Sequence, residues 1–561
     1  MQEIRPTAPR PSRQYASVVC STVMLLTGSL GDAQTRTKLA DVLIVGGTVV
    51  DGTGGPPTQA DLAVTDGRIS AIGAHLRVPS RTMIDAHKQV VAPGFIDAHN
   101  HSPPQIARPA FHLNETFIRQ GVTTVVGGPD GECSPRDIER FVSAYRKTGI
   151  GTNVAFYVGH NSIRTEVMGA SQSRAPTSAE VEQMRALVRK GMQAGAVGFS
   201  TGLMYSPGLF SETDEVVALA QEVVPYHGIY ETHVRDPEHA LLQSNWEALD
   251  IARQAAAPLD LTHLTTPGKY HRGLMRAVIE QIEKAREDNL SVVADQYPYT
   301  AIATAQLQEV LNYPPDLHVQ AKSLQAVQAA LRDPQQRARI RQETLTGGAS
   351  GFSLFKSAGA AAILVLVCPG CEHEENRFLV DIAAQRQVEG FDAVVALLSQ
   401  AQGAITVSMG GFFEDDLQML MKTPWTMIAS DGGIPQADEH TPHPRFTGTF
   451  PRLLGRYVRE LHILTLEDAV RKMTSAPAEF LGLQGRGRLA VGKIADIVIF
   501  DPVRVIDHST WKDPLAAPSG VSVVMVNGVL VLKDATMTGK APGRYLKRGG
   551  DSEALAPPGA T

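Results

Sequence analysis

GFIDAHNHS, residues 94–102, places two histidines, His99 and His101, one residue apart directly after the apolar run VVAPGFIDA. In an extended strand, side chains two positions apart point to the same face of the sheet. The pair can therefore converge on one metal ion, or the two residues can be ordinary polar groups where a strand ends. The residues at the ends of the other strands decide between these interpretations.

Beyond this stretch, runs rich in β-branched residues alternate with helical stretches, such as PTSAEVEQMRALVRKGMQAG at 176–195. This alternation is typical of βα units in a parallel sheet. Eight candidate strands end near His99, Gly127, His160, Thr201, His233, His263, Asp295 and Asp431. Eight such units favour a closed (β/α)8 TIM barrel of the α/β class over residues 92–484. An excursion at about 298–424 separates the seventh strand from the eighth.

Short β-runs occur at both ends of the chain, for example DVLIVGGTVVDG at 41–52 and GKIADIVIFDP at 492–502. Neither end alone carries enough strands for a stable sheet. We therefore expect residues 38–91 and 485–548 to pair into one small β-sandwich domain built from both termini. The tail 549–561, rich in small and polar residues, is expected to be disordered.

The first residues have the composition of a leader. Arg5, Arg10 and Arg13 precede the apolar run YASVVCSTVMLLTGSL, and the small residue Ala33 follows it. This order predicts a signal peptide at residues 1–33 and an exported protein, periplasmic or secreted. No later segment reaches the roughly 20 apolar residues that cross a bilayer, so no membrane span is expected in the mature protein.

Charge and cysteine content narrow the classes of partner and site. A net charge of −6 argues against nucleic acid or an anionic membrane as the partner. After the leader, the cysteines are Cys133 and the CPGC pair Cys368 and Cys371. The pair can be half a zinc site, a redox pair, a structural disulfide or free thiols. Because no second CxxC exists, we favour the disulfide or free thiols.

Catalytic groups of a (β/α)8 barrel gather at the C-terminal ends of its strands. Here those positions carry His99, His101, Asp130, His160, His233, His263, Asp295 and Asp431. A lone histidine is more often a hydrogen-bonded core group, but five at strand ends in a chain with 17 histidines indicate a site. Imidazole and carboxylate ligands suit zinc or a similar divalent ion, which lowers the pKa of water to about 7. Asp431, in TMIASDGG, is placed to accept and return a proton, unless it only forms an Asp-Gly turn.

The chain resembles the amidohydrolase superfamily, specifically the D-aminoacylase (N-acyl-D-amino-acid deacylase) family, over residues 40–548. The motifs are PGFIDAHNH, GVTTVVGG, GFSTGLMYSPG, YETHVRD, ASDGG, HPRFTGTFPRLLGRYVRE and GRLAVGKIADIVIFDP. The resemblance implies a metal-binding barrel with a β-sandwich from both termini. It also implies that His99, His101, His233 and His263 are metal ligands and that Asp431 is the catalytic acid/base and a further candidate metal ligand.

Two departures from the family affect the expected ligands. Where the D-aminoacylases have a cysteine ligand shortly after GVTT, this chain reads GGPDGECS, with Asp130 at the matching position. Asp130 is the first choice of ligand, Glu132 and Cys133 lie close behind, and the ion count is left at one or two. The family also often has a substrate-binding lysine where this chain has Thr265, and Lys269 is the candidate replacement.

Five further residues receive roles from the resemblance or from their positions. Arg445 in HPRFTG is suited to bind a substrate carboxylate, because guanidinium binds carboxylates bidentately. Tyr205 in GLMYSPG could hydrogen-bond the substrate carbonyl or the tetrahedral intermediate, or serve as a core aromatic residue. His160 and Asp295 are expected to orient ligands, and Arg235 to do the same or to contact substrate.

The leading hypothesis is a metal-dependent amidohydrolase that cleaves the amide of N-acyl amino acids, with D stereochemistry suggested by the resemblance. Its partner would be a small acylated molecule. The same scaffold could instead act on a lactone, a cyclic amide or a dipeptide. A metal-free binding or assembly protein is the alternative from another class, but such a relative would be expected to lack several of the matched ligands. The sequence leaves the acyl group, side chain and oligomeric state open.

Overall fold

The computed structural model describes residues 39–317, 323–347, 353–435, 442–550 and 553–554. The expected signal peptide, residues 1–33, lies outside these residues. Among the helices that are described, none has the length and apolar character needed to cross a membrane.

Eight parallel strands form the central barrel and follow one another in chain order. They are β6 (Phe95–Asp97), β7 (Val122–Gly127), β8 (Asn153–Gly159), β9 (Gly198–Gly202), β10 (Ile229–His233), β11 (Leu259–Leu261), β12 (Val292–Gln296) and β16 (Thr426–Ile428). The first and last strands approach through a parallel bridge between Asn100 and Gly432. The backbone N–H of His101 donates to the Gly432 carbonyl at 2.8 Å there. The predicted (β/α)8 barrel is confirmed.

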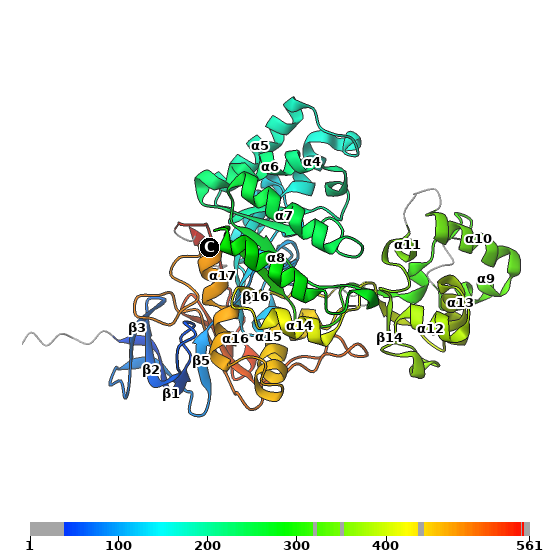
Figure 1. Ribbon diagram of the computed structural model, residues 1–561. Coiled ribbons are helices and arrows are strands. Elements are labelled where there is room, and N and C mark those ends of the chain that lie inside the picture. Colours follow the sequence, from blue (N-terminus) through cyan, green and yellow to red (C-terminus); the bar gives the residue numbers. More distant parts are fainter. Residues whose placement is uncertain (1–38, 318–322, 348–352, 436–441, 551–552, 555–561) are drawn as a thin grey trace, which may run out of the picture. The chain divides into compact units, whose positions relative to one another are not determined.

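Amphipathic helices follow most of the barrel strands (Figure 1). They include α3 (Pro135–Thr148), α4 (His160–Met168), α5 (Ser178–Gln193), α6 (Thr213–Ala220), α7 (Leu241–Ala255), α8 (Met275–Glu287), α14 (Glu414–Met421) and α16 (Leu466–Met473). Helix α3 begins at a capping box between Ser134 and Asp137. It buries Ile138, Phe141, Val142 and Tyr145, the i, i+3, i+4, i+7 spacing of one helix face.

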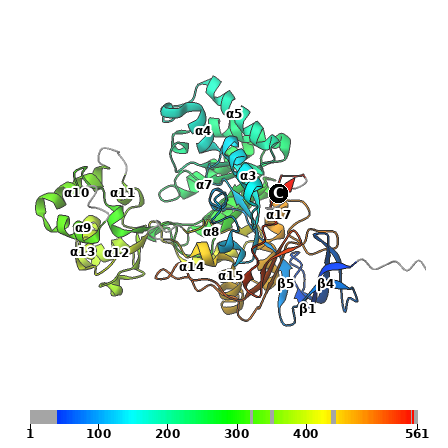
Figure 2. The same cartoon turned by 180° about the vertical axis from the view of Figure 1, so that it is seen from behind.

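Strands from both ends of the chain form one mixed nine-stranded sheet, which confirms the predicted two-ended β-domain. The N-terminal strands are β1 (Ala40–Val49), β2 (Thr58–Thr65), β3 (Arg68–Gly73), β4 (Ser80–Asp85) and β5 (Val90–Pro93). The C-terminal strands are β17 (Ile497–Phe500), β18 (Val521–Val526), β19 (Val529–Lys533) and β20 (Thr536–Met537). Antiparallel pairing of β5 with β17 joins the two halves. Figure 2 shows β1, β4 and β5 together in this sheet.

The continuous apolar runs of this sheet reflect burial on both faces. In β17, Ile497 and Ile499 join the small sheet's own core, whereas Val498 and Phe500 belong to the core shared with the barrel. Successive side chains of a strand point to opposite faces, so such a strand needs apolar residues at every position. One face of the sheet therefore packs against the barrel, where Val498 and Phe500 share a core with Phe95 and Val122.

The excursion between β12 and β16 has its own core. It contains β13 (Thr304–Gln306), β14 (Leu364–Val367), β15 (Thr406–Ser408), α9 (Leu324–Arg332), α10 (Pro334–Thr346), α11 (Leu354–Ala358), α12 (Leu379–Arg386) and α13 (Gly390–Gln400). Side chains such as Val327, Ile340 and Leu397 pack together in this core. A disulfide joins Cys368 to Cys371, and both are buried. Helix α14 packs beside α8 of the barrel, so it does not belong to the excursion expected at 298–424.

The remaining short elements connect these layers. They are α1 (Pro103–Ile106), α2 (Glu115–Ile118), α15 (Arg445–Arg452), which continues into a π-helical segment at Leu453–Glu460, and α17 (Ser475–Phe480). Near the C-terminus, β21 (Arg544–Tyr545) pairs with β8, and β22 (Glu553–Ala554) pairs with β21. The expectation of disorder over 549–561 is therefore wrong for residues 553–554, which gain backbone partners; 551–552 and 555–561 lie outside the described residues.

Candidate metal centre

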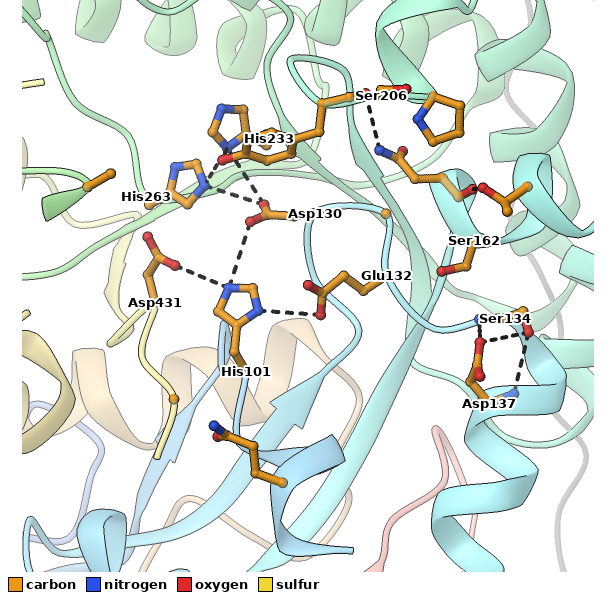
Figure 3. Close-up of a pocket in the computed structure, with 18 of the residues that line it drawn as sticks. His101, Asp130, Glu132, Ser134, Asp137, Ser162, Ser206, His233, His263 and Asp431 are labelled. Carbon is orange, nitrogen blue, oxygen red and sulfur yellow. Dashed lines mark hydrogen bonds and ion pairs between the residues drawn. The ribbon is translucent and has the colours of Figure 1, made fainter. Parts of the chain in front are cut away.

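The C-terminal ends of five barrel strands bring six predicted site residues together. His99 and His101 follow β6, and Asp130 follows β7; His233 ends β10, His263 follows β11, and Asp431 follows β16. Five of the six, all except the fully buried His99, line one cavity of about 1200 Å³. Figure 3 shows His101, Asp130, His233, His263 and Asp431 facing one another across this cavity.

The first cluster consists of His99, His101, Asp130 and Asp431. Asp431 Oδ1 lies 3.5 Å from His99 Nε2 and 3.2 Å from His101 Nε2. Asp130 Oδ2 lies 3.6 Å from His99 Nε2 and 3.8 Å from His101 Nε2. Two imidazoles and two carboxylates thus direct four potential donor atoms at one point.

The second cluster consists of Asp130, His233 and His263. Asp130 Oδ1 lies 3.4 Å from His263 Nε2 and 3.8 Å from His233 Nδ1, and these two ring nitrogens are 2.8 Å apart. Asp130 therefore belongs to both clusters and turns one carboxylate oxygen to each. Its backbone has a φ of 55°, and the adjacent Gly131 has 79°, so a tight left-handed turn presents the side chain.

The donor set fits divalent metal ions. His99 Nε2 and Asp130 Oδ1 are buried without a hydrogen-bond partner among the described residues, which is costly unless another group binds them. Burial and the neighbouring charge of His263 lower the pKa of His233 to about 3, whereas hydrogen bonds to Asp431 and Glu132 raise the pKa of His101 to about 10, so metal binding would release the His101 proton. Mixed imidazole and carboxylate donors suit zinc and similar ions.

Groups behind the two HxH histidines hold their rings in place. Glu231 Oε1 lies 3.1 Å from His99 Nδ1, Thr262 Oγ1 also contacts that nitrogen, and Glu132 Oε2 lies 3.4 Å from His101 Nδ1. A carboxylate on the second ring nitrogen fixes the tautomer that presents the first to a metal. Burial raises the pKa of Glu231 to about 7.

Sequence reasoning missed Glu231 and Thr262 but predicted Asp295. The Asp295 carboxylate accepts from the backbone N–H of His263 at 2.8 Å and from the Thr262 hydroxyl at 3.2 Å, as an orienting residue should. Glu231 had one usable signal: it precedes His233 by two residues in β10, so both side chains share a face of the strand. Nothing in the sequence singled out Thr262.

A buried aspartate near the first cluster connects the first barrel strand to the last one. The backbone N–H and the hydroxyl of Ser430 donate to the carboxylate of Asp97, at 2.9 and 2.5 Å. The side-chain amide of Asn100 donates to it as well, at 2.8 Å. Asp97 therefore links the loop that carries His99 and His101 to the loop that carries Asp431.

Tyr205 and Arg445 lie where a substrate would meet the metal clusters. Both line the cavity. The Tyr205 hydroxyl is 3.2 Å from His233 Nδ1, and Arg445 Nη1 is 3.1 Å from Asp431 Oδ2. Arg445 also donates to the Ile302 carbonyl at 3.1 Å, which fixes its guanidinium beside the first cluster.

Three other predicted residues lie elsewhere, and none of them lines the cavity. Lys269 forms an ion pair with Asp381 of the excursion. Arg235 pairs with Glu247 at 2.9 Å, and His160 contacts Glu215 at 2.9 Å. Each cationic or imidazole side chain turns to a nearer carboxylate, so Lys269 and Arg235 are not brought to the substrate site and His160 does not orient a ligand.

Of the two alternatives to Asp130, only Glu132 reaches the cavity. Glu132 lines it, and its side chain is 49% exposed. Cys133 is buried among apolar side chains of the barrel core and belongs to neither cluster. Asp130 is thus the residue of this loop that the fold places between the histidines.

Comparisons with known proteins identify the family of this chain. The Amidohydrolase family model matches residues 382–532. The chain is 34% identical over 540 residues to the D-aminoacylase of Alcaligenes xylosoxydans xylosoxydans, covering 92% of this chain and 99% of the relative. It is 33% identical over 531 residues to the N-acyl-D-glutamate deacylase of the same organism, covering 91% and 96%.

A solved structure of a related deacylase also matches this chain. The N-acyl-D-glutamate deacylase from Bordetella bronchiseptica, complexed with zinc and a phosphonate mimic of the tetrahedral intermediate, matches with a TM-score of 0.71 and 30% identity. The match covers 91% of this chain and 100% of that chain. The chain therefore belongs to the amidohydrolase superfamily and, within it, to the D-aminoacylase-like family.

Proposed function

We propose that the protein hydrolyses the amide bond of N-acyl-D-amino acids with the help of one or two divalent ions, zinc being the best match. The observation that carries the proposal is the pair of histidine and aspartate clusters that share Asp130 and face one cavity beside Asp431. The D stereochemistry rests on the relatives, whose names specify D-amino-acid derivatives.

His99, His101, Asp130 and Asp431 would hold one ion, and Asp130, His233 and His263 the other. Such an ion supplies Lewis acidity toward a carbonyl oxygen and makes water acidic enough to react near neutral pH. Glu231 and Glu132 keep the imidazoles of His99 and His101 in the ligand tautomer.

Asp431 moves the proton in this proposal. Its carboxylate accepts the proton that the attacking water loses and delivers it to the amide nitrogen, which leaves as an amine. Arg445, 3.1 Å from Asp431 Oδ2, holds that carboxylate in position. The Tyr205 hydroxyl, on the opposite side of the clusters beside His233, can donate to the carbonyl oxygen as negative charge develops there.

The residues that line the cavity next to Arg445 indicate which amino acid the substrate would contain. Its wall there contains Ile302, Ala303, Ile434 and Phe446. Arg445 can offer its remaining guanidinium donors to the α-carboxylate, while this apolar wall favours an apolar side chain. We therefore place substrates such as N-acyl-D-leucine ahead of N-acyl-D-glutamate.

The direct test is a paired stereochemical assay on zinc-loaded protein. N-Acetyl-D-leucine, N-acetyl-L-leucine and N-acetyl-D-glutamate are compared by the release of free amino acid. The proposal predicts release from the D-leucine compound and little from the other two. Release from the L compound at an equal rate would contradict the stereochemical assignment, and no release from any of the three would reject the deacylase function.

A further inference from the structure

The cavity extends away from the metal clusters into a polar arm. The arm is formed by residues at the start of α3 and along α4, namely Ser134, Arg136, Asp137, Arg140, Asn161, Ser162, Thr165 and Glu166. Figure 3 shows Ser134, Asp137 and Ser162 on the far side of Glu132 from His263 and Asp431. Every side chain of the arm carries a hydrogen-bonding or charged group.

The position of Arg445 indicates which half of the substrate enters this arm, if the proposed function holds. Arg445 and the proton donor Asp431 lie together, so the departing amino acid occupies their side of the scissile bond. The acyl group extends from the carbonyl carbon in the opposite direction. In Figure 3 Glu132 and the labelled arm residues lie on the side of the site away from Asp431, so the polar arm is the part of the cavity open to the acyl group.

Size and polarity argue against a simple acetyl or fatty acyl group. The cavity volume of about 1200 Å³ exceeds the roughly 300–1,000 Å³ usual for small-molecule pockets. An acetyl group would leave the arm empty. A hydrocarbon chain would gain little there, because the arm offers no aliphatic side chain and its polar groups would lose their contact with water.

Two charges in the arm have no partner. Arg140 pairs with Asp137 at 3.0 Å. Arg136 and Glu166, both exposed, form no hydrogen bond or ion pair within the part of the chain that the structure describes. The arm thus offers one unpaired cation, Arg136, and one unpaired anion, Glu166, to a molecule bound in it.

We propose that the acyl group of the substrate ends in an amino-acid-type zwitterion, as in a γ-glutamyl amide of a D-amino acid. Its carboxylate binds the Arg136 guanidinium, and its ammonium binds the Glu166 carboxylate. Hydrolysis breaks the carbonyl–nitrogen bond. The water oxygen stays on the acyl carbon as a carboxylate, and both water protons end on the released nitrogen as an ammonium group, so the products are two amino acids.

Four amides of D-leucine test this assignment, with γ-glutamyl, glutaryl, hexanoyl and acetyl groups. Glutaryl lacks only the ammonium, and hexanoyl lacks both charges. We expect kcat/KM for the γ-glutamyl compound to exceed that of the glutaryl compound by about tenfold, for the loss of one charged contact, and to exceed that of the hexanoyl and acetyl compounds by more, because they lose both contacts. A hexanoyl or acetyl compound that is cleaved as well as the γ-glutamyl compound overturns the proposal, and a preferred glutaryl compound overturns the role of Glu166.

Substitutions then assign the effect to the two residues. Arg136→Gln and Glu166→Gln should each lower the γ-glutamyl-to-acetyl ratio of kcat/KM about tenfold. Lys147→Gln and Glu139→Gln, at exposed positions of α3 outside the cavity lining, are matched charge controls and should leave the ratio unchanged. An unchanged ratio in both arm variants contradicts the proposal.

Binding separates this inference from the deacylase proposal on which it rests. Calorimetry on zinc-loaded Asp431→Asn protein should show tighter binding of γ-glutamyl-D-leucine than of hexanoyl-D-leucine, and Arg136→Gln in that background should remove the difference. If the parent cleaves no acyl amino acid but binding is selective, the deacylase proposal fails and the zwitterion assignment stands. Equal binding of the two ligands overturns the assignment even in an active deacylase.

Discussion

Asp130 connects the two clusters of the candidate metal centre. Its two carboxylate oxygens face different histidine pairs, so one side chain belongs to both clusters. The resemblance implies a cysteine at this position in D-aminoacylases, and a carboxylate is a harder donor than a thiolate. The left-handed turn at Asp130 and Gly131 presents this side chain between the strands.

Replacing Asp130 should weaken metal binding according to the donor that remains. Loss of an orienting residue behind a ligand typically costs about 10–100-fold in metal affinity, so loss of a shared ligand in Asp130→Ala should cost at least as much. Asp130→Cys should retain binding close to that of the parent. Zinc affinity measured by competition with a chelating dye checks both variants, and parent-like affinity in Asp130→Ala would show that Asp130 is only a turn residue.

Asp431→Asn isolates the proton transfer. Asparagine has nearly the same shape but cannot carry the proton, so kcat should fall by roughly 10²–10⁴-fold while the protein stays folded. Zinc content must be measured on the same sample, because Asp431 also belongs to the first cluster. A variant that keeps its metal and retains kcat within a few-fold of the parent would remove Asp431 from the mechanism.

The clustering of the four histidines could be predicted from sequence because strand geometry fixes the direction of their side chains. Side chains two apart share a face, and barrel strands deliver their ends to one site. Lys269 and Arg235 follow the same strands, yet their long side chains turn to Asp381 and Glu247. Those partners lie 112 and 12 residues further along the chain, and no local pattern reveals which carboxylate a flexible cation will meet.

At the level of elements, the closure between β6 and β16 controls the first cluster. The two strands meet through backbone contacts just beyond their ends and through Asp97, which accepts three hydrogen bonds. These contacts hold the HxH loop beside the Asp431 loop. The site is therefore held by the same interactions that close the barrel.

Asp97→Ala should loosen this closure. Three buried donors would lose their acceptor, at a cost of roughly 2–4 kcal/mol in the free energy of unfolding. Urea unfolding in the presence of a chelator measures this change in the free energy of unfolding without a contribution from metal binding. Asp85→Ala, at an exposed strand end, is the matched control and should change stability little. Equal stability of the Asp97 variant and the parent would show that Asp97 does not hold the two loops.

At the level of the whole molecule, most of the architecture follows from alternation of apolar runs. The eight barrel strands and the two-ended sheet were both predictable, because each consists of short β-branched runs bounded by turns or helical stretches. The boundary of the excursion was not, since only the packing of α14 beside α8 assigns that helix to the barrel. Burial of β17 on both faces likewise depends on long-range packing.

The excursion should be separable from the barrel. Its two ends meet in the antiparallel pair Gln306 and Thr406, so an Asn-Gly turn can replace residues 307–405 and close a hairpin of β13 and β15. Because the excursion packs its own core, the shortened chain should remain folded and bind zinc. Circular dichroism and metal analysis check this, and an aggregated product without zinc would show that the barrel requires the excursion.

Activity measured against zinc content shows whether hydrolysis needs a metal ion. Protein stripped with a chelator is titrated with zinc while N-acetyl-D-leucine hydrolysis and bound ion per chain are measured together. We expect negligible activity without metal and recovery as the first ion, about one per chain, is bound. Full activity in rigorously metal-free protein would show that the reaction needs no metal.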